Sequence, residues 1–156
     1  MSRREIRDAE VEDLESLRAL INTAYEVEAV FVSGPRIDIE ELAERLSRGR
    51  FLIAEQRRSI IGCVYLEVRG KTAYFGLLSV APEHQGEGLG RRLVEAAEHR
   101  ARALGCREMS LRVVNLRTEL PPWYQRLGYR ETGTTPFPDR HRQLKPCHFL
   151  EMAKPL

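Results

Sequence analysis

The stretch that decides the fold is Leu77-Leu78-Ser79-Val80-Ala81-Pro82-Glu83-His84-Gln85-Gly86-Glu87-Gly88-Leu89-Gly90-Arg91-Arg92-Leu93. It reads as an apolar strand, a turn with three alternating glycines and the start of an amphipathic helix that Gly105 ends. The first N–H groups of a helix lack internal partners and lie at the positive end of its dipole, so they suit a phosphate. Arg91 and Arg92 in the first turn disfavour the helix but favour a bound polyanion. The stretch therefore predicts an anion-binding turn.

Two other glycine motifs fit this turn less well. A dinucleotide-binding turn needs G-x-G-x-x-G inside a βαβ unit, whereas Gly86, Gly88 and Gly90 are spaced G-x-G-x-G. A P-loop needs Gly-Lys-Ser/Thr, which does not follow here. A plain tight turn without a ligand stays open as the alternative.

The sequence around the turn predicts a mixed α/β sheet. An apolar stripe at helical spacing runs from Val11 to Ala24, and Asp38 is expected to cap a second helix that ends at Gly49. Short turns join strands expected over residues 51–55, 60–68 and 72–80, which favours an antiparallel meander. The strand expected over Glu108 to Val114 follows the long helix, so it should run parallel to the third strand of the meander.

The remaining elements complete one domain over residues 1–156. They are a first strand from Arg4 to Arg7, a short helix after Pro121-Pro122, and closing strands over residues 129–134 and 147–152. The order β-α-α-β-β-β-α-β-α-β-β predicts a mostly antiparallel sheet flanked by helices.

Composition bounds the class of protein. The chain has 156 residues, 42% of them hydrophobic, and a formal net charge of +2, which suits one soluble globular domain and excludes a disordered chain. No apolar run is long enough for a membrane helix, and no secretory leader is expected at the start. Cys63, Cys106 and Cys147 lack a CxxC spacing, so we expect reduced thiols in a cytoplasmic protein and no metal site.

The turn resembles a known family. Gln85-Gly86-Glu87-Gly88-Leu89-Gly90 is similar to the Q/R-x-x-G-x-G/A signature of the GNAT superfamily of acyl-CoA-dependent N-acetyltransferases, and the element order resembles that fold over essentially the whole chain. The resemblance implies that acetyl-CoA binds with its pyrophosphate on Gln85, Gly86, Glu87, Gly88, Leu89, Gly90 and Arg91, and with its pantetheine arm on the backbone of Leu78, Ser79 and Val80. Glu87 departs from the family, where a basic residue is common, and we expect it to point to solvent.

A second segment carries the same resemblance. Asn115 followed by Trp123-Tyr124-Gln125-Arg126-Leu127-Gly128-Tyr129 is similar to the family's N…(L/F)-Y-x-x-x-G-(F/Y) segment, with Asn115 two residues farther from the tyrosine than is commonest. The resemblance implies that Asn115 contacts the cofactor and that Tyr124 protonates the leaving thiolate. A phenol with a pKa near 10 suits that role. The alternative is that Tyr124 only packs its helix onto the sheet.

The family implies direct attack of an amine on the thioester, without an acyl-enzyme. Cys63 and Cys106 are therefore expected to be buried fillers rather than nucleophiles. Glu67 is the proposed general base, because strand alternation puts it on one face with Cys63 and Tyr65, where burial would raise its pKa. The alternatives are that Glu67 emerges into solvent, or that His148 or a water chain takes the proton.

The break between the first two helices borders the acceptor site in the resembling family. Tyr25, Phe31 and Arg36 are therefore candidate substrate-binding residues, with Arg36 suited to a substrate carboxylate. Glu26 and Glu28 would instead suit a cationic amine, and a plain solvated segment is the alternative.

These residues predict an N-acetyltransferase that moves an acetyl group from acetyl-CoA to a primary amine of a small molecule or peptide. The alternatives are a non-catalytic acyl-CoA-binding regulatory module, an NAD-binding oxidoreductase and a DNA-binding protein. The basic residues lack interleaved aromatics, so neither a nucleic-acid nor a membrane partner is expected. The oligomeric state is open, with a homodimer as one alternative.

Overall fold

The computed structural model describes residues 5–138 and 140–156, and within these ranges seven strands form one sheet. The strands are β1 (Glu5–Asp8), β2 (Arg50–Gln56), β3 (Ser59–Arg69), β4 (Thr72–Val80), β5 (Glu108–Val114), β6 (Arg130–Pro136) and β7 (His148–Pro155). Their order in the sheet is β1-β2-β3-β4-β5-β7-β6, and only the β4–β5 pair is parallel among these described strands. The prediction of a mostly antiparallel sheet with one parallel step after the long helix is confirmed.

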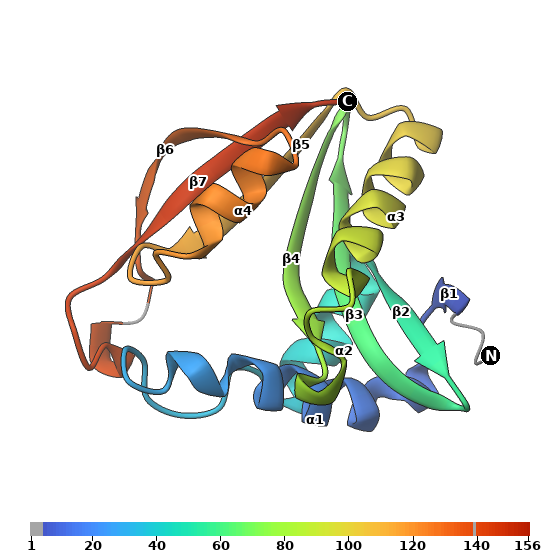
Figure 1. Cartoon of the computed structure of the whole chain (residues 1–156), viewed down its shortest axis with the longest axis horizontal. Coiled ribbons are helices and arrows are strands. Elements are labelled where there is room, and N and C mark those ends of the chain that lie inside the picture. Colours follow the sequence, from blue (N-terminus) through green and yellow to red (C-terminus); the bar gives the residue numbers. More distant parts are fainter. Residues whose placement is uncertain (1–4, 139) are drawn as a thin grey trace.

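The helices lie on both faces of the sheet (Figure 1). They are α1 (Leu14–Ala24), α2 (Ile39–Arg48), α3 (Leu89–Ala103) and α4 (Leu120–Arg126), with 3-10 turns η1 (Val11–Asp13), η2 (Tyr25–Glu28), η3 (Pro82–His84) and η4 (Arg140–Arg142). The predicted cap of α2 is confirmed, because the Asp38 carboxylate accepts a 2.8 Å hydrogen bond from the Glu41 N–H. None of the helices in the described part of the chain is long and apolar enough to cross a bilayer.

Strand alternation divides the core into two layers. In β3, Val64 and Leu66 pack with the apolar face of α3, whereas Cys63 and Tyr65 pack with α1 and α2. Burial of Cys63 and Cys106 confirms that both fill the core. The sheet is therefore covered on both faces over β2–β4.

Some boundaries and faces differ from the sequence prediction. Val11 is 68% exposed because it lies in η1, ahead of α1, and so does not belong to the apolar stripe. Ile39 and Leu104 are exposed because each lies at a helix end, where the core no longer covers it. The predicted start of the first strand, Arg4, lies outside the described residues.

The sheet splits between its two parallel strands. The β4–β5 pairing holds only from Thr72↔Glu108 to Tyr74↔Ser110, and Figure 1 shows the two strands diverging beyond it. A bulge lies in the diverging half of β4, where Leu77 and Leu78 stand opposite the single residue Val64 and Leu77 adopts a φ of 53°. Because a bulge bends its strand and adds twist, it turns β4 away from β5. The split gives the molecule two limbs, β1–β4 with α3 and β5–β7 with α4.

Candidate functional site

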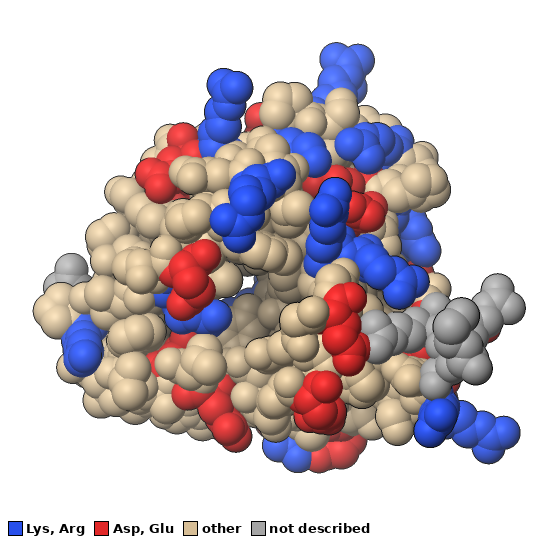
Figure 2. All heavy atoms as spheres, in the orientation of Figure 1, with Lys and Arg blue, Asp and Glu red and all other residues tan. Residues whose placement is uncertain are grey.

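A cavity of about 600 Å³ occupies the split between the limbs. Its walls come from β4 (Phe75 to Leu78), β5 (Leu111 to Val114), Tyr124 of α4 and the segment that joins α1 to α2. Figure 2 shows the hollow near the middle of one face, bordered by acidic and basic side chains. Beyond Tyr74, the β4 edge that faces β5 has no partner strand among the described residues. The cavity therefore combines apolar walls with backbone polar groups that are open to a ligand.

The turn after β4 has the geometry of an anion cradle. Gly86 and Gly88 both adopt a φ of 80°, and a Cβ added to either would meet no atom within 4 Å, so the backbone conformation and not lack of space requires glycine there. Gly88 is the N-cap of α3, with no side-chain cap and no acidic residue in the first turn among the described residues. The first intrahelical bond runs from the Arg92 N–H to the Gly88 carbonyl at 3.2 Å. The N–H groups ahead of it can therefore receive an anion.

The side chains of the turn mostly leave this cradle free. The Gln85 Nε2 donates to the Val80 carbonyl at 3.1 Å, which ties the turn to the end of β4. Glu87 is exposed and lies against His84 at 3.4 Å, in agreement with the expectation that it points to solvent. Arg91 pairs with Glu95 at 2.9 Å on the outer face of α3.

The pantetheine candidates lie between the cradle and the cavity. Leu78 lines the cavity, Ser79 is buried with its hydroxyl donating to the Leu77 carbonyl at 2.9 Å, and Val80 ends the strand. Trp123 of α4 closes the approach from the other limb, with ring carbons 3.5 and 3.6 Å from the Cβ position of Gly90. The turn, the bulged strand and α4 thus meet at one end of the split.

Tyr124 packs against other aromatic rings of the core and also lines the cavity. It is 5% exposed, and its ring lies 5.9 Å from that of Phe75 and 6.0 Å from that of Tyr129. Burial raises the pKa of its hydroxyl well above the usual range, with Tyr25 and Tyr74 adding to the rise and Arg117 opposing it. No hydrogen-bond partner of this hydroxyl occurs in the described part of the chain. Tyr124 is therefore a protonated donor that is free to bond a ligand in the cavity.

Glu67 lines the cavity, but the expected direction of its pKa shift is wrong. The side chain is 6% exposed and shares a face with Cys63 and Tyr65, as alternation predicts. Burial acts to raise its pKa, but the 2.7 Å hydrogen bond from Tyr65 and the bond and charge of Arg69 outweigh it, so the pKa is lowered. Because both carboxylate oxygens are occupied, Glu67 is a weak proton acceptor.

The residues predicted to bind the acceptor differ in whether they line the cavity. Tyr25 and Arg36 line the cavity, with the Arg36 guanidinium 5.2 Å from the centre of the Tyr25 ring. Phe31 is not part of the lining, because its ring lies 5.9 Å from the Lys145 Nζ and its carbonyl accepts from the Leu144 N–H at 2.7 Å. Phe31 therefore holds the loop before β7 in place.

Asn115 and His148 bind each other away from the cavity lining. The Asn115 Oδ1 accepts from the His148 N–H at 2.8 Å, and the Asn115 N–H donates to the His148 carbonyl at 2.9 Å. These bonds extend the contact between β5 and β7 past the end of β5. The geometry gives Asn115 a structural role and places His148 outside the group of cavity residues.

The three cysteines lie outside the lining of the cavity. Cys63, Cys106 and Cys147 are free thiols and none of them lines the cavity. Burial raises the pKa of the Cys63 thiol to about 12, which keeps it protonated and unreactive. The described residues hold no cluster of three or more His, Cys, Asp or Glu side chains that could bind a metal ion.

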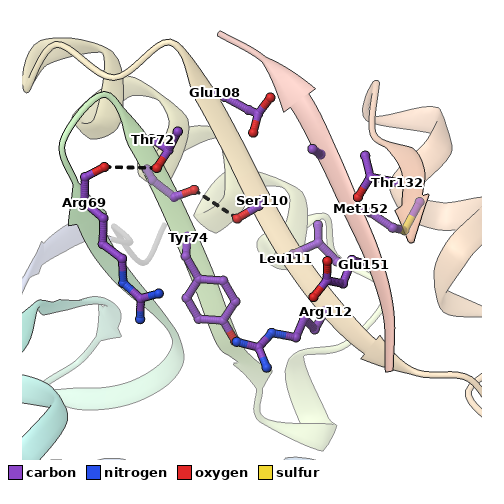
Figure 3. A pocket seen from close by; sticks show the side chains of 12 residues that line it. Arg69, Thr72, Tyr74, Glu108, Ser110, Leu111, Arg112, Thr132, Glu151 and Met152 are labelled. Carbon is purple, nitrogen blue, oxygen red and sulfur yellow. Dashed lines mark hydrogen bonds between the residues drawn. The ribbon is translucent and has the colours of Figure 1, made fainter. Parts of the chain in front are cut away.

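Sequence reasoning missed several residues of the cavity lining, among them Tyr74 and Arg112. Tyr74 and Arg112 lie on neighbouring strands with the Arg112 guanidinium 5.6 Å from the centre of the Tyr74 ring, and Figure 3 shows the two side chains converging so that their ends meet. A second hollow of about 270 Å³ continues from here over the uncovered face of the sheet. Strand alternation could have placed Tyr74 on the face of β4 opposite to that of Phe75. Only the fold, however, brings Arg112 beside Tyr74.

Known proteins resemble this chain in sequence and in structure. Residues 47–131 match the family model described as an acetyltransferase (GNAT) domain. An amino-acid acetyltransferase of Pseudomonas syringae pv. syringae is 29% identical over 141 residues, which cover 89% of this chain and 30% of that protein. The chain thus spans less than a third of the length of that relative.

Two solved structures share the fold. The ribosomal-protein-S18-alanine N-acetyltransferase from Escherichia coli superposes with a TM-score of 0.82 at 20% identity, over 98% of this chain and 94% of that chain. The PaiA N-acetyltransferase from Thermoplasma acidophilum, in complex with coenzyme A, gives a TM-score of 0.82 at 21% identity and covers 99% of each chain. At this level of identity the likeness concerns the fold.

Proposed function

The chain belongs to the family of GNAT acetyltransferase domains, and on that premise we propose that it transfers an acetyl group from acetyl-CoA to a primary amine of a small molecule or peptide. The observation that carries the proposal is the uncapped glycine turn of α3 at one end of the split whose wall contains Tyr124. The relatives named amino-acid acetyltransferases support an amine acceptor.

The residues present fit acetyl-CoA. The backbone N–H groups at the start of α3 hold the pyrophosphate, since Gly86 and Gly88 let the chain turn there without a Cβ facing the anion. The open edge of β4 at Leu78–Val80 offers backbone groups to the pantetheine arm, as an added strand would use them. When bound, acetyl-CoA supplies the acetyl group as an activated thioester.

Tyr124 acts as the general acid in this proposal. The raised pKa makes this hydroxyl a weaker acid than the pKa near 10 expected from the sequence, but it keeps the hydroxyl protonated at neutral pH with a free hydrogen bond to offer. It donates that proton to the departing thiolate sulfur as the amine nitrogen bonds to the acetyl carbon. The buried ring contacts with Phe75 and Tyr129 keep the donor in one position, which lowers the entropy cost of reaction.

Glu28 is the proposed acceptor of the amine proton, in place of Glu67. Glu28 is buried and lines the cavity, and its charge raises the pKa of Tyr25. Among the described residues only its Oε2 is engaged, by Arg117 at 2.8 Å. Its Oε1 can therefore take a proton, directly or through a water molecule. Glu67 is the alternative, with both oxygens already bonded.

The proposal includes a cytoplasmic location and excludes a nucleic-acid partner. All three cysteines are free thiols, which is typical of a reducing compartment. The basic residues Arg91 and Arg100 of α3 are bound to Glu95 and Asp8, which reduces their availability to a phosphate backbone.

Release of free thiol from acetyl-CoA, measured over a panel of primary amines, tests the proposal. Calorimetry with coenzyme A on the same protein reports cofactor binding separately. Binding together with thiol release supports the enzyme, whereas binding without release for any amine would favour the regulatory module. Absence of binding, or a thermal shift with NAD and none with coenzyme A, would overturn the proposal.

A further inference from the structure

The cavity carries more positive than negative charge. Among its described lining residues are six arginines and four glutamates. The arginines are Arg36, Arg45, Arg48, Arg69, Arg112 and Arg142, and the glutamates are Glu26, Glu28, Glu41 and Glu67. A charge excess alone does not identify a ligand, because side chains that are already paired within the protein have few hydrogen bonds left to give a ligand. The partners of each group therefore decide what the cavity can bind.

Four of the arginines are already engaged by the protein. Their partners are Glu41 for Arg45 at 3.2 Å, Glu44 for Arg48 at 3.4 Å, Glu67 for Arg69, and the Ser33 and Pro35 carbonyls for Arg142 at 2.9 and 2.6 Å. These contacts hold the cavity walls together. They leave Arg36 and Arg112 as the two lining arginines without a hydrogen bond or ion pair of their own among the described residues, while Arg45 keeps one buried Nε without a partner.

Aromatic rings hold both of these arginines. The Arg36 guanidinium lies 5.2 Å from the ring centre of Tyr25, and that of Arg112 lies 5.6 Å from Tyr74 and 5.8 Å from Phe149. Neither has an ion pair or a hydrogen bond from its side chain within residues 5–138 and 140–156. A ring under the guanidinium orients it while leaving its N–H edge free. Both side chains are therefore arranged in advance for an acidic ligand.

The nearest carboxylate to Arg112 along the sheet is turned to another partner. Glu151 faces Arg112 in the β5–β7 register, as Figure 3 shows, yet no oxygen of Glu151 is within 4 Å of the guanidinium. The Glu151 carboxylate instead accepts a hydrogen bond from the Thr135 hydroxyl. An internal ion pair therefore does not satisfy Arg112.

The acidic residues of the cavity offer less to a cationic ligand. Glu28, Glu41 and Glu67 are bound by Arg117, Arg45 and Arg69. Glu26 is the one lining glutamate without a partner in the described part of the chain, and it is exposed at the rim. Among the described lining residues, one carboxylate (Glu26) and two guanidinium groups (Arg36 and Arg112) thus have no hydrogen bond or ion pair at all.

We propose that the acceptor is an amine that carries two carboxylates, one bound by Arg36 and the other by Arg112, as in an acidic α-amino acid. The inference rests on the proposed function, because it names the substrate of the same cavity. Each guanidinium presents a planar fork that matches a carboxylate with two parallel hydrogen bonds. The two arginines belong to the α1–α2 segment and to β5, so one ligand would bridge the two limbs of the sheet.

The first test measures the initial rate of thiol release from acetyl-CoA with different amines as the acceptor. L-glutamate and L-aspartate are compared with L-glutamine, L-isoglutamine and putrescine. We expect kcat/KM to fall roughly 10- to 100-fold when either carboxylate of glutamate becomes an amide, which is the loss typical of a hydrogen bond to a charged group. Equal rates for glutamate and its amides, or a higher rate with putrescine, would overturn the inference and leave the acetyltransferase proposal standing.

Calorimetry with glutarate gives a second test that does not need turnover. Glutarate carries both carboxylates but no amine, and it is titrated into protein saturated with coenzyme A. Arg36→Gln and Arg112→Gln should each weaken its binding roughly 10- to 100-fold and leave the coenzyme A affinity unchanged. Arg18→Gln is the matched control, because Arg18 lies partly exposed on α1, outside the cavity lining, and pairs only with Glu15 among the described residues.

The glutarate result separates the two proposals. Glutarate binding that both variants weaken, together with faster thiol release for glutamate than for its amides, supports the acidic acceptor. Absence of glutarate binding to the parent protein, or equal binding by the parent and both variants, overturns it. Failure of coenzyme A itself to bind contradicts the proposed function instead.

Discussion

The hydroxyl of Tyr129 donates a 2.7 Å hydrogen bond to the carboxylate of Glu98, and both side chains are almost fully buried. The Lys154 Nζ reaches the same carboxylate at 3.0 Å. Glu98 lies in α3, whereas Tyr129 follows α4 and Lys154 lies in β7. Because β4 and β5 pair over only three residue pairs, this network is a tie between the two limbs on the α3 side of the sheet.

Glu98→Ala should lower the free energy of unfolding by about 3 kcal/mol, because it removes one partner of a buried ion pair and leaves Tyr129 without an acceptor. Urea denaturation at pH 7 measures the loss. Glu95→Ala is the control, since Glu95 is exposed on the same helix and pairs only with Arg91 among the described residues. Equal losses in the two variants would contradict a structural role for the network.

Gly88→Ala and Gly70→Ala should separate backbone strain from cofactor binding. Both glycines have a positive φ, of 80° and 62°, and neither site would place a Cβ within 4 Å of another atom. Each substitution should therefore cost about 1 kcal/mol of stability. Only Gly88→Ala, at the start of α3, should also weaken coenzyme A binding in calorimetry. Loss of binding in the Gly70 variant as well would argue against the cradle.

Tyr124→Phe should lower kcat by roughly 100-fold, the low end of what a general acid contributes. The ring contacts with Phe75 and Tyr129 do not depend on the hydroxyl, so stability and coenzyme A affinity should stay near the parent values. Thiol release and calorimetry on the same preparation check both statements. An unchanged kcat would leave Tyr124 with its packing role alone.

Glu28→Gln should lower kcat/KM roughly 100-fold at pH 7, because the carboxylate that accepts the amine proton is lost. Activity should partly recover at high pH, where more of the acceptor amine is already deprotonated. Glu67→Gln should change the rate less, since Tyr65 and Arg69 already occupy both Glu67 oxygens. A larger loss in the Glu67 variant would return the role of the base to that residue.

The stability of the chain should decrease in acid partly through Asp13. Two hydrogen bonds from Arg7, at 2.9 and 3.0 Å, lower the pKa of Asp13, with burial opposing them and the Glu10 N–H assisting. A carboxyl group whose pKa is lowered on folding stabilises the protein above its unfolded pKa of about 3.9, and the contribution is lost as the pH falls through the folded value. Asp13→Asn should therefore cost about 1 kcal/mol at pH 7 and progressively less as the pH falls below about 4. Urea denaturation over a series of pH values from 7 downward checks the trend.

Local sequence determines much of this fold. The strand and helix periodicities of residues 50–114, the Asp38 cap and the glycine turn all depend on neighbours a few residues apart. The parallel step between β4 and β5 follows as well, because a helix joins them. Tyr124 could be identified because the segment Trp123 to Tyr129 resembles the motif of the GNAT superfamily.

The partners of the cavity residues depend on the tertiary structure. Asn115 binds His148, Glu67 binds Tyr65 and Arg69, and Arg112 lies between Tyr74 and Phe149. Strand register decides the partners of Asn115 and Arg112, because their contacts come from segments more than 30 residues away in the chain. The charge state of Glu67 follows from the balance between burial and its bonded neighbours, and no local pattern encodes that balance. The sequence alone therefore determined the elements and the glycine turn that we propose for anion binding, while three-dimensional packing decided which charged groups lack a partner in the cavity.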